Sequence, residues 1–273
     1  MTDTVPDPAR GLPALLDVMR RLRDPARGCP WDIEQTFETI APFTIEEAYE
    51  VADAIERGDM GDLRAELGDL LLQVVYHAQI AAEAGHFDFD EVARGVARKM
   101  IDRHPHVFGT GDRDKSAAQQ TRDWEEAKAA ERAARAQDGA LADVALNLPA
   151  LMRAEKLQKR AARVGFDWPD VAQVLDKLTE EAGELAEARA TADPGDIAEE
   201  YGDLLFVAVN LGRHLKVDPE TALRAANAKF VRRFARIEAD LAAAGRTPHD
   251  ATLDEMEAIW QAAKRAEKAG PAD

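Results

Sequence analysis

Hydrophobic side chains recur along nearly the whole chain at the spacing of one helix face, and no alternating run of β-branched residues interrupts them. Glycine and proline residues divide this pattern into segments. It predicts helices over about residues 12–24, 44–57, 62–85, 90–103 and 117–137, and then over 150–163, 170–191, 196–215, 218–243 and 252–268. The sequence therefore predicts an all-α fold, with loops at 28–32 and 109–116.

The order of these segments repeats in the second half of the chain. Residues 46–75 align with residues 180–209 without a gap at an offset of 134 positions, and 15 of the 30 aligned positions are identical. We therefore expect two tandem helical modules. The predicted limits are an N-terminal module at 10–138, a linker at 139–148 and a C-terminal module at 149–268, with flexible termini at 1–9 and 269–273.

Acidic residues mark the repeat, in pairs spaced three apart so that both side chains of a pair lie on one helix face. A short connection should pack the two helices of each module as an antiparallel hairpin, which brings four carboxylates together. Such an oxygen-only site suits Mg²⁺, with Mn²⁺ as a possible substitute. The expected metal ligands are Glu47, Glu50, Glu66 and Asp69 in the first module, and Glu181, Glu184, Glu200 and Asp203 in the second.

Acidic residues in this pattern have three alternative roles. The first is at helix ends, since Thr44 and Glu47 fit a capping box and Asp62 and Asp196 fit N-cap positions. The second is a ferritin-like di-iron site, which would need a Glu-x-x-His pair, whereas the corresponding pairs here end in aspartate. The third is a solvated helix face, which disagrees with the nearly apolar run 70–75 because unpaired buried charge is expensive.

Basic and aromatic residues accompany the acidic pairs in the second half. Lys229 and Arg233 share a helix face, as do Trp260 and Lys264. Cations beside an acidic metal site suit a substrate with several phosphates, and an aromatic ring can stack on a base. The alternative is that the cations are surface charges and that the tryptophan packs in the core.

Composition restricts the class of protein. The chain has 273 residues and a formal net charge of −17, which argues against binding to nucleic acid or an anionic membrane. Its single cysteine, Cys29, cannot form an internal disulfide, which is compatible with a reducing compartment. The first ten residues lack the basic start and apolar run that are typical of a signal peptide, and no apolar stretch approaches the roughly 20 residues needed to span a bilayer. A soluble cytoplasmic protein is expected.

Taken together, the motifs resemble those of the MazG-type nucleoside triphosphate pyrophosphohydrolases, in their long form with two tandem modules. The resemblance covers about residues 10–268. It rests on Gly28–Asp32, Glu46-Glu47-x-x-Glu50, Glu66-Leu67-Gly68-Asp69 and Arg103–Phe108, and in the second half on Val164–Trp168, Glu180-Glu181-x-x-Glu184, Glu200-Tyr201-Gly202-Asp203 and Lys229–Phe234.

The resemblance implies helical modules whose four-helix-bundle-like core is completed in a homodimer, and Mg²⁺-dependent cleavage of nucleoside triphosphates to monophosphate and pyrophosphate. It assigns the carboxylates above to the metal, and Lys229, Arg233, Trp260, Lys264 and Trp168 to the substrate. It favours the second module as the main catalytic centre. Our hypothesis for the mechanism is that Glu180 or Glu181 takes a proton from the attacking water there, while Lys229, Arg233 and Lys264 stabilise the leaving pyrophosphate.

Three functions remain open at this point. The first is broad hydrolysis of nucleoside triphosphates for housekeeping of the nucleotide pool, including clearance of damaged nucleotides or control of an alarmone. The second is a narrower pyrophosphohydrolase acting on dUTP, dCTP or phosphoribosyl-ATP. The third is a non-catalytic helical module that binds nucleotides or mediates dimerisation or regulation.

Overall fold

Every regular element that the computed structural model describes is helical, which confirms the expected all-α fold. The described residues are 5–110, 114, 116–134, 139–191 and 193–269. The chain divides into two compact units, residues 1–130 and 131–273. The linker at 139–148 stays a prediction.

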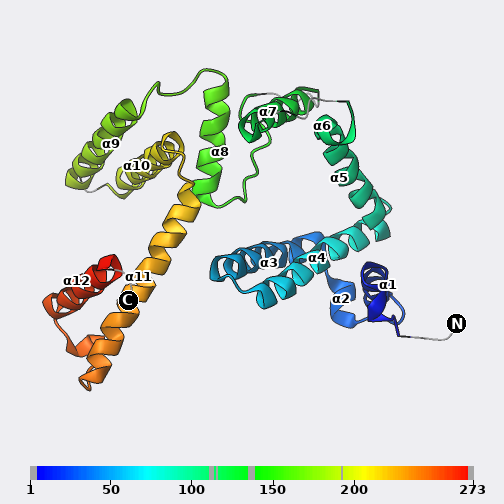
Figure 1. Ribbon diagram of the computed structural model, residues 1–273, viewed down its shortest axis with the longest axis horizontal. Helices are drawn as coiled ribbons and strands as arrows, with labels where there is room; N and C mark the ends of the chain where they lie inside the picture. The colour runs from blue at the N-terminus through cyan, green and yellow to red at the C-terminus, as the bar shows by residue number, and fades with distance from the viewer. Residues whose placement is uncertain (1–4, 111–113, 115, 135–138, 192, 270–273) are drawn as a thin grey trace. The chain divides into compact units, whose positions relative to one another are not determined.

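The first unit is built around a helical hairpin, α3 and α4, which lie side by side (Figure 1). Gly58 makes the turn between them at a φ of 69°, a left-handed conformation that costs glycine nothing. Its core consists of Met19, Ile40, Val75, Tyr76 and Ile80. In order, the elements are η1 (Pro8–Arg10), α1 (Leu12–Leu22), α2 (Pro30–Glu34), α3 (Phe37–Arg57), α4 (Met60–Glu83), α5 (Phe89–Arg103), α6 (Pro105–Phe108) and α7 (Ala117–Ala134), whose last residues fall beyond the unit.

A second hairpin, α9 and α10, organises the second unit, with α8 packed on α10 and α11, and α12 packed on α11 (Figure 1). Its buried apolar residues include Val174, Val207, Val209, Ile237 and Leu241. The elements are α8 (Ala150–Arg163), α9 (Val171–Thr191), α10 (Pro194–His214), α11 (Pro219–Ala243), η2 (Pro248–Asp250) and α12 (Leu253–Ala269).

The helix that carries the first glutamate pair begins earlier than the sequence predicted. Thr36 caps α3 in a capping box with Thr39, and Pro42 lies inside the helix. The expected capping box at Thr44 is wrong, because Thr44 sits in the helix interior and its hydroxyl lies 2.9 Å from Nε2 of His77. Glu47 therefore has no role at a helix end.

The helix starts after the two hairpin turns also differ from prediction. Asp59 and Asp193 are the N-caps of α4 and α10, each accepting a hydrogen bond from the backbone N–H two residues on. Asp62 and Asp196, which were expected to be the caps, lie in the first helical turn. Aspartate was the right type of capping residue, but each cap lies three residues earlier in the sequence than predicted. The expected loop at 28–32 likewise contains the start of α2.

A buried arginine fixes this loop against α4. Arg23 is 8% exposed, and its guanidinium donates to both carboxylate oxygens of Glu83 and to the backbone oxygens of Asp32 and Gln35. The Tyr76 hydroxyl donates to the same Asp32 backbone oxygen at 3.0 Å. The chain segment around α2 is therefore held to the hairpin of the first unit by charged hydrogen bonds.

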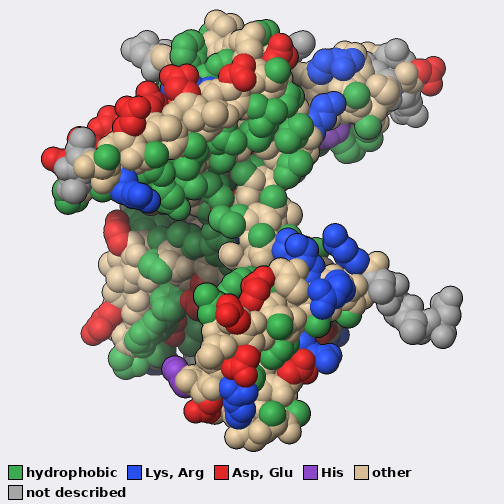
Figure 2. Space-filling model, turned by 90° about the vertical axis from the view of Figure 1, so that its left-hand side faces the viewer, with side chains coloured by type: hydrophobic (Ala, Val, Ile, Leu, Met, Phe, Trp, Pro, Cys, Tyr) green, Lys and Arg blue, Asp and Glu red, His purple; other side chains and the backbone are tan. Residues whose placement is uncertain are grey.

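Both hairpins leave large hydrophobic side chains exposed. Figure 2 shows hydrophobic side chains gathered over the α9–α10 pair, where Leu175, Tyr201 and Leu205 are all more than 40% exposed. Leu67 of α4 is 50% exposed in the first unit. Contiguous apolar surface of this kind is typical of a protein interaction site. Among the described residues, no helix is long and apolar enough to cross a membrane.

Candidate functional site

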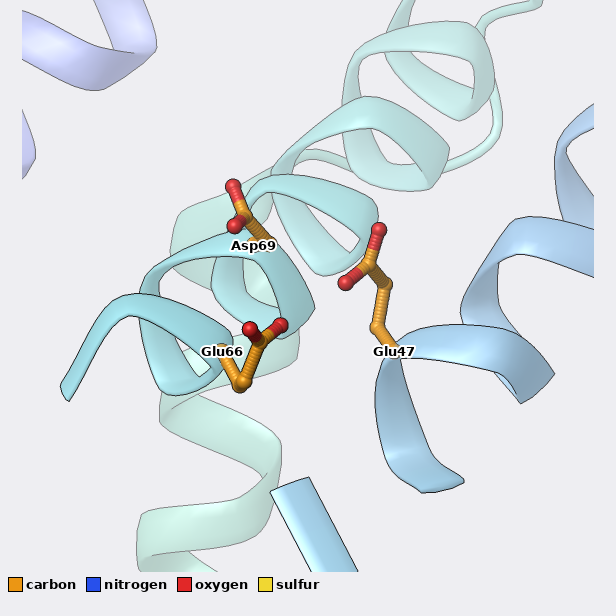
Figure 3. A group of neighbouring side chains, drawn as sticks. All are labelled: Glu47, Glu66 and Asp69. Atoms are coloured by element: carbon orange, nitrogen blue, oxygen red, sulfur yellow. The ribbon is translucent and has the colours of Figure 1, made fainter. Parts of the chain in front are cut away.

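Three carboxylates of the first hairpin converge. Glu47 of α3 and Glu66 and Asp69 of α4 each offer an oxygen, and these oxygens lie within 4.8 Å of one another. Figure 3 shows the Glu47 side chain extending from α3 toward α4, where Glu66 and Asp69 lie one turn apart. The spacing of three residues between Glu66 and Asp69 places both on the α4 face that meets α3. The hairpin predicted from the sequence thus brings them together.

The carboxylates of this group repel one another, and the repulsion contributes to raised pKa values. Partial burial raises the pKa of the Glu47 carboxyl, and the charges of Asp69 and Glu50 raise it further. Partial burial, with the neighbouring charge of Glu50, also raises the pKa of Glu66. In the described part of the chain, none of these four carboxylates has a lysine or arginine at ion-pair distance. The group therefore favours a positive ligand.

The second hairpin builds a corresponding group. Oxygens of Glu181 and Glu184 on α9 and of Glu200 on α10 lie within 4.8 Å of one another. Glu181 is buried, at 5% exposure. Partial burial raises the pKa of Glu200, and the charges of Glu184 and Glu181 add to the shift.

Each group contains three of the four carboxylates expected for it. We call Glu47, Glu66 and Asp69 the first trio, and Glu181, Glu184 and Glu200 the second trio. Glu50 lies beside the first trio and interacts with Glu47 and Glu66, but it is not one of the three. Asp203 likewise lies beside the second trio, close enough for its charge to raise the pKa of Glu200, but it is not one of the three. The two trios therefore differ in which helix supplies two of the three carboxylates, which is the second helix of the hairpin in the first unit and the first helix in the second unit.

A lysine enters the second trio but not the first. Nζ of Lys177 lies 2.8 Å from carboxylate oxygens of both Glu180 and Glu181, and 3.8 Å from Oε2 of Glu184. These hydrogen bonds raise the pKa of Lys177. Lys177 was not among the site residues predicted from the sequence. Its position four residues before Glu181, on the same helix face, was the available signal.

The expected substrate residues form a separate cluster on α11 and α12. The Arg233 guanidinium lies over the Trp260 ring, and its Nη2 is 2.6 Å from Glu267. Trp260 also contacts the Phe230 ring, with centroids 5.4 Å apart. Lys229 is exposed and Lys264 is half-buried. Figure 1 shows α12 packed on α11 at a distance from the α9–α10 hairpin.

Trp168 lies in the loop between α8 and α9. Together with Phe166 and Asp167 it lines a small pocket that contains none of the second trio. Asp167 is paired with Arg213 and His214, which anchor the loop to the end of α10. The structure therefore brings the acidic residues together, but it does not place Trp168 or the α11–α12 cations beside them.

The donor set decides what the trios can hold. Three carboxylates from two helices supply only hard oxygen ligands, which fit Mg²⁺ or Mn²⁺ and not a metal that prefers nitrogen or sulfur. A cation held there would relieve the repulsion that raises the pKa values of Glu47, Glu66 and Glu200. The same cation would also bind phosphate oxygens of a substrate.

A single protein-family model matches both hairpins. The family model described as MazG nucleotide pyrophosphohydrolase domain matches the chain twice, at residues 35–108 and 170–236. The first match contains α3 and α4, and the second contains α9 and α10.

Full-length relatives match across both units. The chain is 53% identical to the nucleoside triphosphate pyrophosphohydrolase of Escherichia coli (strain K12) over 255 residues, which cover 93% of this chain and 97% of that protein. It is 42% identical over 250 residues to the nucleoside triphosphate pyrophosphohydrolase/pyrophosphatase MazG of Thermotoga maritima, covering 92% and 94% of the two chains. A nucleoside triphosphate pyrophosphohydrolase of Mycolicibacterium smegmatis is 37% identical over 163 residues, covering 59% of this chain and 49% of that one.

Proposed function

The chain belongs to the MazG nucleotide pyrophosphohydrolase family, and from this membership we propose that it hydrolyses nucleoside and deoxynucleoside triphosphates to the monophosphate and pyrophosphate. It is accordingly an enzyme. We further propose that Mg²⁺ is its cofactor, that it accepts a broad range of bases, and that it acts in the cytoplasm on the nucleotide pool. The observation that carries the proposal is the carboxylate trio, built from two packed helices in each unit.

In the second unit, Glu181, Glu184, Glu200 and Asp203 would hold the cation. When bound, Mg²⁺ neutralises phosphate charge and lowers the pKa of water. Glu180, which is 58% exposed and lies outside the trio, would accept the proton of the attacking water once its 2.8 Å ion pair with Lys177 opens. That water's oxygen bonds to the α-phosphorus as the bond to the α–β bridging oxygen breaks, and pyrophosphate leaves.

The cations of α11 and α12 would act on the leaving group. Charge accumulates on pyrophosphate as the bond breaks, and Lys229 and Arg233 are suited to neutralise it. Trp260 offers a half-buried ring beside Arg233 for contact with the nucleoside. Because these residues lie away from the trio of their own chain, the proposed function includes a homodimer in which one chain's cations approach the other's carboxylates. The exposed apolar faces of the hairpins support such pairing.

The test is pyrophosphate release by the purified full-length protein from a panel of ribo- and deoxynucleoside triphosphates, with Mg²⁺ and with EDTA. We expect Mg²⁺-dependent release from all bases, and at least a hundredfold loss in Glu184→Gln and Asp203→Asn. The matched control is Glu199→Gln, which removes an exposed carboxylate next to Glu200 and should retain activity. Near-normal turnover in both Glu184→Gln and Asp203→Asn would remove the site from consideration.

The same variants in the first unit identify which module turns over. Glu50→Gln and Asp69→Asn occupy the positions that correspond to Glu184 and Asp203 at the offset of 134 residues. If the second module is the main catalytic centre, these two variants retain most of the activity. Loss of activity equal to that of the second-module variants would show that catalysis needs both modules.

A further inference from the structure

The two carboxylate sites differ at one position that the internal repeat aligns. Position 177 in α9 corresponds to position 43 in α3 at the offset of 134 residues, and the residues are Lys177 and Phe43. Each lies four residues before the second glutamate of its module, Glu181 or Glu47, and therefore on the same helix face as that glutamate. One site thus has a cation built into its own helix and the other does not.

Lys177 pairs with carboxylates that a metal ion in the second trio would need. Its ammonium contacts oxygens of Glu180 and Glu181 at 2.8 Å and lies 3.8 Å from Glu184. Glu181 and Glu184 are two of the three carboxylates of the second trio. Because Glu181 is only 6% exposed at its side chain, its ion pair is screened little by solvent. The lysine therefore compensates this site internally.

Phe43 cannot form such an ion pair with the carboxylates of the first unit. Its ring meets the Trp31 ring edge to face, with centroids 6.5 Å apart, and it carries no charge. Among the described residues no lysine or arginine pairs with Glu47, Glu66 or Asp69. The first trio is accordingly left with its mutual repulsion, and an incoming cation displaces nothing.

We propose that the two sites bind a divalent cation unequally, the first trio holding the free ion more tightly than the second because Lys177 must leave Glu181 and Glu184 before an ion can enter. This rests on the proposed function, in that both trios are taken as metal sites. At low metal concentration the first unit carries an ion while the second is closed by its own lysine. The metal dependence of the catalytic module then reports displacement of Lys177.

The experiment measures Mn²⁺ binding to the full-length protein, by the electron paramagnetic resonance signal of free Mn²⁺ and by titration calorimetry, without nucleotide. Two backgrounds isolate the sites. Glu66→Gln with Asp69→Asn leaves only the second trio, and Glu200→Gln with Asp203→Asn leaves only the first. We expect the first trio to bind Mn²⁺ roughly tenfold more tightly, since removing an ion pair of this burial changes an equilibrium by about that factor.

Substitutions at the two aligned positions assign the difference to the lysine. In the background that retains the second trio, Lys177→Met should raise Mn²⁺ affinity to that of the first trio, whereas Lys177→Arg, which keeps the charge, should leave it weak. Lys156→Met is the control, because it removes one exposed positive charge from α8 of the same unit. In the other background Phe43→Lys should weaken binding, and its melting curve shows whether loss of the Trp31 contact has unfolded it.

The outcomes separate this inference from the function on which it rests. Equal Mn²⁺ affinities in the two backgrounds, or the same change in Lys177→Met as in Lys156→Met, would overturn unequal loading while leaving both metal sites in place. Absence of Mn²⁺ binding in both backgrounds would overturn the metal sites, and the inference with them.

Discussion

The guanidinium carbon of Arg233 lies 5.3 Å from the centroid of the Trp260 ring, which joins α11 to α12 through a cation–π contact. Glu267 completes the arrangement with a 2.6 Å ion pair to the same guanidinium. The arginine is thereby held in one orientation, with only 12% of its side chain exposed. A cation oriented in advance binds a phosphate at a smaller entropic cost than a mobile one.

Arg233→Lys should therefore impair catalysis more than a change that keeps the charge would suggest. Lysine lacks the planar fork that binds two phosphate oxygens and stacks on an aromatic ring. We expect kcat/KM for ATP to fall by about 10- to 100-fold, the range for loss of one charged hydrogen bond of about 1.5–3 kcal/mol. Steady-state pyrophosphate release measures the effect.

The control for this variant is Glu267→Gln, which weakens the tether but leaves the arginine and the ring. It should change kcat/KM by no more than about fivefold, because weakening this partly exposed ion pair costs about 1 kcal/mol or less. An equal loss in both variants would mean that Arg233 acts through the packing of α12 and not on the substrate.

Arg23→Ala should destabilise the first unit. Its guanidinium is buried and bonds Glu83 and two backbone oxygens of the α2 segment, so truncation leaves these acceptors without their donor. We expect a loss of about 3 kcal/mol in the free energy of unfolding, the lower end for breaking a buried charged pair. Urea denaturation followed by circular dichroism gives this value.

Glu83→Gln separates the charge from the hydrogen bonds. An amide oxygen still accepts from the arginine, and the Glu83 side chain is 36% exposed, so the loss should be about 1 kcal/mol or less. If Arg23→Ala unfolds at the same urea concentration as the wild-type protein, the anchoring role of Arg23 is refuted.

The hairpins and their carboxylates could be predicted from the sequence because the controlling interactions are local. Helical spacing fixes which residues share a face, and a short turn permits only antiparallel packing. The exact start of α3 was not predictable in this way. Pro42 reads as a helix boundary, yet Thr36 and Thr39 form a capping box upstream and the helix continues through the proline.

The position of the phosphate-binding candidates could not be derived from spacing. Lys229 and Arg233 share a face of α11, but the direction of α11 relative to α9 and α10 depends on packing between distant segments. Sequence grouped these cations with the trio on chemical grounds alone. Lys177, in contrast, lies within about one helical turn of its carboxylate partner Glu181, so helical spacing would have predicted their contact. It was missed because only acidic positions were considered as members of the site.

His77 should make the stability of the first unit depend on pH. Burial lowers the pKa of the imidazole below its ordinary value of 6.5, so the folded protein favours the neutral ring, which stacks on Phe37. Below pH 6.5 the unfolded chain binds a proton more readily than the folded one. The contribution of His77 is therefore present above pH 6.5 and is lost as pH falls through its folded-state pKa.

The aligned position in the second unit suggests the test variant. Leu211 corresponds to His77, and Leu178 corresponds to its partner Thr44. The double variant Thr44→Leu with His77→Leu should lose less stability than the wild-type protein between pH 7 and pH 5.5 in urea titrations. A parallel pH dependence in the two proteins would contradict the assignment to His77.

Glu66 should make the stability of the first unit depend on pH in the opposite direction. Its pKa is raised by partial burial and by the charge of Glu50, so ionisation of this carboxyl opposes folding. The contribution of Glu66 to stability is present below pH 4.5 and is lost as pH rises through its folded-state pKa. In EDTA at pH 7.5, Glu66→Gln should therefore melt at a higher temperature than the wild-type protein.

Mg²⁺ should act against this difference in melting temperature. A cation bound to the folded state stabilises it by mass action, so Mg²⁺ should raise the melting temperature of the wild-type protein more than that of Glu66→Gln. Differential scanning fluorimetry with a Mg²⁺ series compares the two. An identical Mg²⁺ shift in both proteins would show that Glu66 is not a ligand.

Two inactive variants should restore activity when they are combined. Because α11 and α12 hold their cations away from the trio of the same chain, a site shared between copies would join the carboxylates of one chain to Arg233 of another. Asp203→Asn lacks one half of such a site and Arg233→Gln the other. In a mixed dimer one site contains both substitutions and the second contains neither.

The mixture is made by unfolding and refolding the two variants together at equal concentration. Half of the dimers are then mixed and each has one intact site of two, so the expected activity is about a quarter of wild type for a two-fold symmetric dimer. Each variant refolded alone is the control for residual activity. A mixture no more active than the mean of the two controls places carboxylates and cations in the same chain, and α11 would then have to bend toward α9 when substrate binds.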